Sequence, residues 1–266
     1  MTYHINEVLL KAENVGLSYN DKIILRDIDF TMHNIVRPDI AQGQVVSLIG
    51  RSGIGKTQLF KILAGMQKPT TGSIKIGADM HEVEEGEVGV VSQNYILFNH
   101  RTIRKNLEIA LEHNDKKYTE ADKKNIIADY AEKFNLTEHL DKYPLQLSGG
   151  QRQRVSILQQ ALTSNKFILL DEPFSGLDVL VIDKVVDLLM KISTLHDLNT
   201  LIIVSHDIEN SLAISDTVFI MANEQNKPGA TITEKLDLIE MGLAWNPAIK
   251  ESPVFQELVA HMKYKI

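Results

Sequence analysis

The stretch Gly50–Thr57 has the residue types and spacing of a loop that binds phosphate groups, because it fits the pattern G-x-x-x-x-G-K-[ST]. It follows the apolar run Val45–Ile49 and precedes a helical pattern that ends near Gly65. Backbone N–H groups of such a loop surround phosphates, Lys56 can neutralise their charge, and the Thr57 hydroxyl can ligate Mg²⁺. A glycine-rich turn without a ligand is the alternative. The predicted nucleotide site comprises Gly50, Arg51, Ser52, Gly53, Ile54, Gly55, Lys56, Thr57 and Gln58.

A second chemical signal is the pair Asp171 and Glu172, which directly follows the apolar run Phe167–Leu170. A carboxylate at the end of a strand beside the phosphate loop lies where the second shell of Mg²⁺ would be, which predicts a role for Asp171 in the metal site. The adjacent Glu172 is placed to accept a proton from an attacking water. The alternative is an exposed strand end with a turn at Pro173, and the presence of the phosphate loop favours the catalytic interpretation.

Between these two signals lies the segment Leu147–Gln151, whose sequence is Leu-Ser-Gly-Gly-Gln. Ser148 can cap a helix that begins near Gly149 and runs to Leu162, and the glycines let backbone N–H groups approach an anion closely. One ATP cannot easily occupy both this segment and the loop at Gly50. The sequence therefore predicts a head-to-tail pair of subunits, with a Ser-capped surface helix as the alternative. The predicted phosphate contacts are Ser148, Gly149, Gly150 and Gln151.

Four short apolar runs, each followed by polar residues, predict a parallel sheet that is covered on both faces. They are Val45–Ile49, Val88–Val91, Phe167–Leu170 and Leu201–Val204. A parallel sheet binds ligands beyond the carboxyl ends of its strands, and that edge would carry Lys56, Gln93, Asp171, Glu172 and His206. Between the third and fourth runs, apolar residues at helical spacing predict a crossover helix, at Ile182, Val185, Val186 and Leu189. The predicted fold class is therefore α/β.

Two regions depart from this plan. From Tyr95 to Lys166 the pattern is helical and polar, which predicts a helical subdomain inserted into the sheet domain. The alternation of Ile23–Phe30 predicts antiparallel strands at the flank of the sheet. We expect one domain, with residues 1–94 and 167–230 in the sheet core and its flank, 95–166 in the helical subdomain and 231–266 in a C-terminal tail. The segment His33–Ala41 is longer than an ordinary turn and receives no role.

Composition limits the possible classes of function. The chain has 266 residues, of which 44% are hydrophobic and 24% charged, and can bury a full core. It has no cysteine, so disulfides and thiolate metal sites are excluded. A formal charge of −7 argues against nucleic acid as the main partner. Neither a signal peptide nor an apolar run of about 18 residues is found, so we expect a soluble protein that is not exported.

The order and spacing of these motifs resemble the ATP-binding-cassette (ABC) ATPases over nearly the whole chain. That resemblance implies a P-loop NTPase (RecA-like) parallel sheet core with a flanking antiparallel β subdomain and an inserted α-helical subdomain. It also implies ATP and Mg²⁺ as ligands. Tyr19 matches the aromatic residue that stacks on adenine, and Gln93 matches the glutamine that senses Mg²⁺ and the transporter partner. Asp178 matches an aspartate at the dimer contact, and His206 matches the histidine that holds the γ-phosphate.

The roles implied by the family are therefore of three kinds. The catalytic residues would be Lys56, Gln93, Glu172 and His206. The metal would be bound by Thr57, Gln93 and Asp171. Tyr19 and Asp178 would add to the nucleotide contacts already named.

The free-standing cassette is similar to that of a bacterial importer, because it carries neither a long insertion nor membrane helices. Lys227–Ala230, Glu234–Asp237 and Ser252–Leu258 resemble the ATPases of the nitrate, sulfonate and taurine group. The implied partners are a second copy or a similar ATPase, integral membrane permease subunits and, indirectly, a solute-binding protein. The implied location is cytoplasmic, on the inner face of the cell membrane.

Two alternatives to the importer stay open from the sequence. One is the ATPase of a lipid, lipoprotein or drug exporter with separate membrane chains, and the other is a soluble ABC regulator acting on nucleic acid or ribosomes. The apolar stretch Tyr95–Phe98, just after Gln93, bears on this choice, because in the family this region receives a helix of the membrane partner. Its alternative is burial inside the helical subdomain.

Overall fold

The computed structural model describes residues 3–36, 43–114, 116–163, 166–175, 179–193, 200–244, 246 and 248–266. Within these ranges, ten strands form one mixed sheet in the order β5-β4-β1-β2-β10-β9-β3-β8-β7-β6. The strands are β1 His4–Tyr19, β2 Lys22–Val36, β3 Gln44–Gly50, β4 Thr71–Ile76, β5 His81–Glu82, β6 Gly89–Val91, β7 Phe167–Asp171, β8 Thr200–Ser205, β9 Thr217–Asn223 and β10 Ala230–Asp237.

The predicted parallel core is confirmed. Strands β3, β8, β7 and β6 pair in parallel with their neighbours, and β9 continues the parallel set on the other side of β3. Every residue of β3 and β8 is buried, as expected of strands that helices cover on both faces. The carboxyl ends of β3, β7 and β8 therefore meet along one edge of the sheet.

The predicted antiparallel flank is also confirmed. Strands β1 and β2 pair antiparallel along most of their length, and β4 and β5 extend this part of the sheet beyond β1. The flank joins the core through β10, which pairs antiparallel with β9 and in parallel with β2 at Ala230 and Leu25. Strand β2 extends to Val36, so His33 belongs to a strand, whereas residues 37–41 lie outside the described part of the chain.

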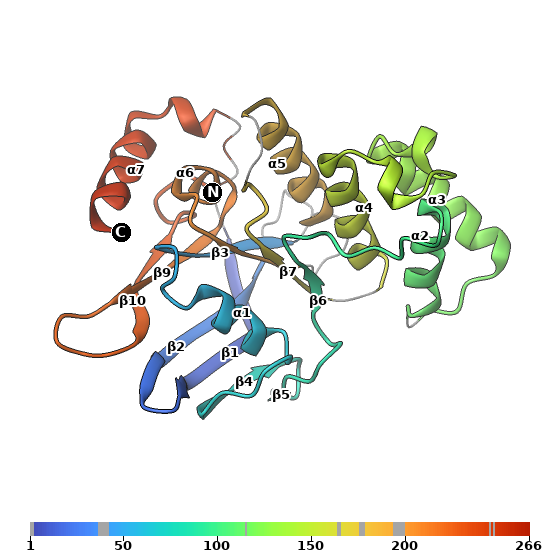
Figure 1. The fold of residues 1–266 in the computed structure, drawn as a ribbon. Helices are drawn as coiled ribbons and strands as arrows, with labels where there is room; N and C mark the ends of the chain where they lie inside the picture. Colours follow the sequence, from blue (N-terminus) through green and yellow to red (C-terminus); the bar gives the residue numbers. More distant parts are fainter. Residues whose placement is uncertain are drawn as a thin grey trace.

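Helices cover both faces of the core and form a separate group beside it (Figure 1). The predicted crossover helix between β7 and β8 is confirmed as α5, and a group of helices follows β6 as the sequence predicts. The helices are α1 Lys56–Leu63, α2 Ile103–Glu112, α3 Glu120–Lys133, α4 Gly149–Ala161, α5 Val179–Ser193, α6 Ile208–Ile214 and α7 Pro253–Lys265, with 3-10 turns at Thr137–His139, Pro144–Gln146 and Ile249–Glu251.

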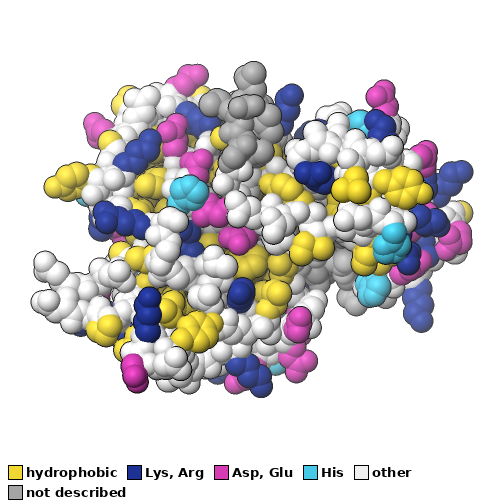
Figure 2. All heavy atoms as spheres, viewed as in Figure 1, with side chains coloured by type: hydrophobic (Ala, Val, Ile, Leu, Met, Phe, Trp, Pro, Cys, Tyr) yellow, Lys and Arg dark blue, Asp and Glu magenta, His cyan; other side chains and the backbone are white. Residues whose placement is uncertain are grey.

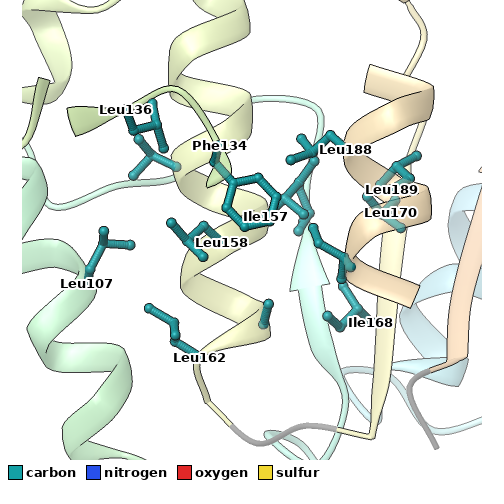
Figure 3. Close-up of a cluster of buried hydrophobic side chains, with 14 of the residues drawn as sticks. Leu107, Phe134, Leu136, Ile157, Leu158, Leu162, Ile168, Leu170, Leu188 and Leu189 are labelled. Carbon is teal, nitrogen blue, oxygen red and sulfur yellow. The ribbon is translucent and has the colours of Figure 1, made fainter. Parts of the chain in front are cut away.

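Helix α4 connects the group of helices to the sheet. In the close-up of the core, Ile157 and Leu158 of α4 lie beside Phe134, and Leu188 of α5 lies on the far side of Ile157 (Figure 3). The same hydrophobic cluster contains Leu107 of α2 and residues of β7. Burial of apolar side chains on both sides of α4 therefore fixes its position relative to the carboxyl end of β7.

Candidate active site

The loop between β3 and α1 has the shape expected of a phosphate-binding loop. Strand β3 ends at Gly50, and α1 begins at Lys56 with Gly55 as its N-cap. Gly55 has a φ of 111°, in the left-handed region, and a Cβ there would lie 3.0 Å from Leu25 Cδ2. A Cβ on Gly50 would lie 2.8 Å from the carbonyl oxygen of Met221. The backbone path of the loop therefore depends on glycine at both positions.

Lys56 lies over this loop and is only 7% exposed. Its Nζ donates to the carbonyl oxygens of Gly50 at 2.9 Å and Arg51 at 3.1 Å, and it lies 3.7 Å from Oε1 of Glu172. Burial lowers the pKa of Lys56, while the nearby Glu172 and Asp171 carboxylates raise it. The ammonium is thus held at the carboxyl edge of the sheet, where it can contact a phosphate bound in the loop.

Glu172 lies at the centre of a small polar network. Its Oε2 accepts hydrogen bonds from Ser205 Oγ at 3.0 Å, the His206 backbone N–H at 3.2 Å and His206 Nδ1 at 2.8 Å. Its own backbone N–H donates to the Val204 carbonyl at 2.8 Å. The convergence predicted from parallel strand ends is confirmed for Lys56, Glu172 and His206.

Asp171 ends β7 and is partly buried. Burial raises the pKa of its carboxyl group, the neighbouring Glu172 raises it further, and Lys56 lowers it. Thr57, its predicted companion in metal binding, is exposed in the first turn of α1. A partly buried carboxylate and an exposed hydroxyl are donors that Mg²⁺ uses when phosphates supply its remaining ligands. The side chains present therefore fit a metal that binds together with a nucleotide.

Gln93 and Tyr19 lie at opposite sides of this centre. Gln93 follows β6, and its Nε2 donates to Ser175 Oγ at 3.5 Å, in the turn that follows Glu172. The Tyr19 hydroxyl donates to Gln58 Oε1 at 3.0 Å and accepts from Gln67 Nε2 at 2.7 Å, while the residue stays 49% exposed. Two amides thus anchor the Tyr19 hydroxyl next to α1 and leave ring surface accessible for stacking.

The segment Leu147–Gln151 begins α4, as predicted. Ser148 is the N-cap: its hydroxyl accepts from the Gln151 N–H at 3.3 Å, and Gln151 Oε1 accepts from the Ser148 N–H at 2.9 Å. A Cβ on Gly149 would meet nothing within 4 Å, so the backbone there is open to a ligand. In the described part of the chain, no hydrogen bond or ion pair joins Ser148–Gln151 to the phosphate loop.

Four polar residues near the predicted site were not found from the sequence. They are Gln67, Ser205, Gln153, which donates to the Pro173 carbonyl, and His139, which contacts Gln151 Nε2 at 3.0 Å. Ser205 precedes His206 at a strand end, and this position could have signalled its role. The other three contacts join distant segments and leave no local pattern. The predicted Asp178 lies outside the described residues.

The loop after Gln93 has a mixed character. Leu97 is buried, at 9% exposure, whereas Ile96 is 77% and Phe98 45% exposed. Asn106 of α2 is fully buried and holds the loop: its Oδ1 accepts from the Phe98 N–H at 2.8 Å, and its Nδ2 donates to the Phe98 carbonyl at 3.2 Å. The predicted burial inside the helical subdomain is therefore confirmed for Leu97, whereas Ile96 and Phe98 form the exposed apolar surface that the other interpretation requires.

The loop, the acidic strand end and the capped helix together have the arrangement of a nucleotide-binding cassette. Residues 33–175 match the family model described as ABC transporter. The chain belongs to the ABC transporter family. Its mixed sheet with helices matches that of ABC cassettes with the P-loop NTPase fold.

Two curated relatives illustrate the similarity. The chain is 36% identical to the sulfate/thiosulfate import ATP-binding protein CysA of Thermosynechococcus vestitus, over 86% of this chain and 66% of that protein. It is 32% identical to the bicarbonate transport ATP-binding protein CmpC of Synechococcus elongatus, over 85% of this chain and 33% of that protein. The chain thus spans from a third to about two thirds of the length of these ABC relatives.

Solved structures show the same ABC fold. CbiO1 from Clostridium perfringens, described as part of the ABC transporter complex cbiONQ, has a TM-score of 0.73 at 23% identity, over 97% of this chain and 100% of that one. The dimeric bacterial ABC transporter cassette MJ0796 has a TM-score of 0.69 at 25% identity, over 86% and 99% of the two chains. Among the described residues, no helix is long and apolar enough to cross a membrane.

The raised pKa of Asp171 leads to a test of stability. A carboxyl group whose pKa is higher in the folded protein stabilises the fold below its unfolded pKa, and this contribution is lost as pH rises through the folded pKa. Asp171→Asn should therefore raise the Tm of the protein free of nucleotide and metal at pH 7, by roughly 2–4 °C for each kcal/mol gained.

Thermal unfolding measured between pH 4 and pH 8 checks this expectation. The difference in Tm between Asp171→Asn and the parent should shrink as pH falls towards the unfolded pKa of about 4. Asp21→Asn, in the exposed turn between β1 and β2, is the control and should leave Tm unchanged at each pH. A lower Tm for Asp171→Asn at pH 7 would contradict the burial argument.

Proposed function

We propose that this chain is the ATP-hydrolysing subunit of an ABC importer that takes up a small solute of the nitrate, sulfonate or taurine kind. The observation that carries the proposal is the convergence of Lys56, Glu172 and His206 behind the glycine loop at the carboxyl edge of the parallel sheet. The functions for which the two relatives are named, sulfate/thiosulfate import and bicarbonate transport, favour import over export.

Each side chain has a role in the proposed reaction. The loop N–H groups and Lys56 bind the β- and γ-phosphates, and Tyr19 stacks on adenine. Thr57, Gln93 and Asp171 would hold Mg²⁺, which would neutralise charge on the phosphates. Glu172 accepts the proton of the attacking water, and His206 holds the γ-phosphate.

Binding of a nucleotide would move Lys56 away from Glu172 and so leave Glu172 free to act as the base. The Lys56 ammonium lies 3.7 Å from Glu172 Oε1, while His206 and Ser205 donate to Glu172 Oε2. Phosphates bound in the loop would attract Lys56, because they carry more negative charge than one carboxylate. Oε1 would then be available to accept a proton from water.

A second ATPase subunit completes the proposed site. Ser148–Gln151 has no hydrogen bond to the phosphate loop of its own chain among the described residues, yet its backbone is open at Gly149. We propose that this segment closes on the γ-phosphate held by a partner, either a second copy or a similar ATPase. Asp178 would contact the partner in the same dimer.

The exposed residues Ile96 and Phe98 support a membrane partner. On the face shown in Figure 2, hydrophobic side chains gather over the group of helices α2, α3 and α4. Lysine and arginine side chains there are interspersed with acidic ones. This distribution and the net charge of −7 favour a helix of a permease subunit over nucleic acid or the ribosome. The chain would then work at the inner face of the membrane, with a solute-binding protein as an indirect partner.

Replacement of the proposed base tests the chemistry. Glu172→Gln removes the proton acceptor but keeps the size of the side chain, so kcat for ATP hydrolysis should fall about 10²- to 10⁴-fold while ATP binding persists. Phosphate release and equilibrium ATP binding measure the two effects. Glu132→Gln, at an exposed position of α3, is the matched control and should retain parental kcat. Parental kcat in Glu172→Gln would rule out this role.

Cysteine cross-linking tests the dimer, and the chain suits it because it has no cysteine of its own. In the Glu172→Gln background, Arg51→Cys combined with Ser148→Cys should form a disulfide between two copies when MgATP is present. Non-reducing electrophoresis shows the linked dimer. Each single cysteine variant is a control and should stay monomeric, because the head-to-tail arrangement brings unlike positions together. Linkage that is independent of nucleotide, or none with it, would contradict the closed dimer.

The proposed membrane contact predicts a selective loss of association. Ile96→Asp places a charge in the exposed apolar loop and should shift most of the chain from native membranes to the soluble fraction, without lowering basal ATP hydrolysis. Sedimentation of membranes that contain the tagged protein measures the distribution. Tyr264→Asp, at a residue that is 91% exposed on α7, is the control and should stay with the membranes. Equal retention of both variants would argue against docking at Ile96.

A further inference from the structure

Helix α4 carries a buried glutamine that contacts the turn next to the proposed base. Gln153 is fully buried, and its Nε2 donates to the carbonyl oxygen of Pro173 at 2.7 Å. Pro173 directly follows Glu172 in the chain. The other amide atom, Gln153 Oε1, is buried without a hydrogen-bond partner. One side chain therefore joins the helix that begins at Ser148 to the turn that carries Glu172.

The turn after β7 needs such support. Glu172 has a φ of 50°, in the left-handed region that non-glycine residues adopt only when surrounding contacts hold them there. Its backbone is held by bonds from its N–H to the Val204 carbonyl at 2.8 Å and from the Ser175 N–H to its own carbonyl at 3.1 Å. Pro173 has no N–H to contribute. Its carbonyl is therefore a main point at which a neighbouring element can hold the turn, and Gln153 uses it.

The cost of burial argues that Gln153 serves more than packing. A buried polar atom without a partner costs about 1–3 kcal/mol, and Gln153 Oε1 is such an atom. The neighbouring positions Val155, Ile157 and Leu158 of α4 are apolar and fully buried, so this helix accommodates apolar side chains well. An apolar residue at 153 would avoid the unpaired oxygen but would leave the Pro173 carbonyl without its donor.

We infer that Gln153 is a positioning residue for hydrolysis, which fixes the Glu172 carboxylate through the Pro173 carbonyl. The inference rests on the proposed function, in which Glu172 is the base. It goes further by connecting Glu172 to α4, whose N-terminus carries Ser148. When a partner's nucleotide contacts Ser148, a shift of α4 moves the amide of Gln153 and with it the turn that holds Glu172. Arrival of the second subunit is thereby coupled to the position of the base.

A matched pair of substitutions on α4 tests the inference. Gln153→Met and Gln159→Met each remove a buried amide that donates to a backbone carbonyl. Gln153 donates to Pro173, next to Glu172, whereas Gln159 Nε2 donates to the Asn106 carbonyl at 3.3 Å, away from Glu172. Gln153→Met should lower kcat about 10- to 100-fold with little change in the ATP dissociation constant, because small displacements of a catalytic group have effects of that size. Gln159→Met should lower Tm comparably and keep kcat. Equal kcat in the two variants would overturn the inference.

A second variant keeps the test valid if Gln153→Met folds poorly. In Gln153→Glu the protonated carboxyl group can donate to the Pro173 carbonyl, whereas the ionised form cannot, and burial raises the pKa of such a carboxyl. The ratio of its kcat to that of the parent should therefore fall as pH rises from 5.5 to 8. A ratio that is independent of pH would count against the hydrogen bond to Pro173.

A double-mutant cycle with Glu172→Gln separates this inference from the proposed function. If Gln153 acts through Glu172, Gln153→Met should not reduce the residual rate of Glu172→Gln further. A full additional loss of 10-fold or more would show that Gln153 acts elsewhere and would overturn the inference while leaving the base assigned. Parental kcat in Glu172→Gln alone would instead reject the base, and the positioning role with it.

Discussion

The attraction between the buried ammonium of Lys56 and the carboxylates of Asp171 and Glu172 is the interaction on which the site depends. Burial of Lys56 is unfavourable for a charged group, so its position requires the Gly50 and Arg51 carbonyls and the nearby acids. Those groups meet only because parallel strands β3 and β7 end at the same edge of the sheet. The hydrophobic core therefore brings the charged groups of the site together, because it fixes where these strands end.

The meeting of polar side chains at this edge could be predicted from the sequence because two independent rules converge there. Near-continuous apolar runs predict parallel strands, and the residues that follow such strands lie together. Lys56, Glu172 and His206 meet as these rules require. The antiparallel flank followed from alternation in β2, where buried and exposed residues take turns along the strand.

Other contacts could not be predicted because they join segments that are distant in the sequence. On α4 the polar residues Gln153, Ser156 and Gln159 recur every three positions, a pattern typical of a solvated helix face, yet all three are buried. The loop Tyr95–Phe98 reads as one apolar run, but Asn106 holds its backbone so that its side chains divide between core and solvent. In both cases a side-chain amide satisfies backbone carbonyls that the local pattern does not reveal.

The unfavourable features of the structure concentrate in the turn after β7. Asp171 has a raised pKa, Glu172 has a positive φ, and the amide that holds Pro173 leaves one oxygen unpaired. Each lowers stability, and the buried clusters around α4 and β7 offset the cost. A sequence selected for stability alone would place a neutral residue at 171. The combination is explained if this turn must present a charged carboxylate at one position and respond to movement of α4.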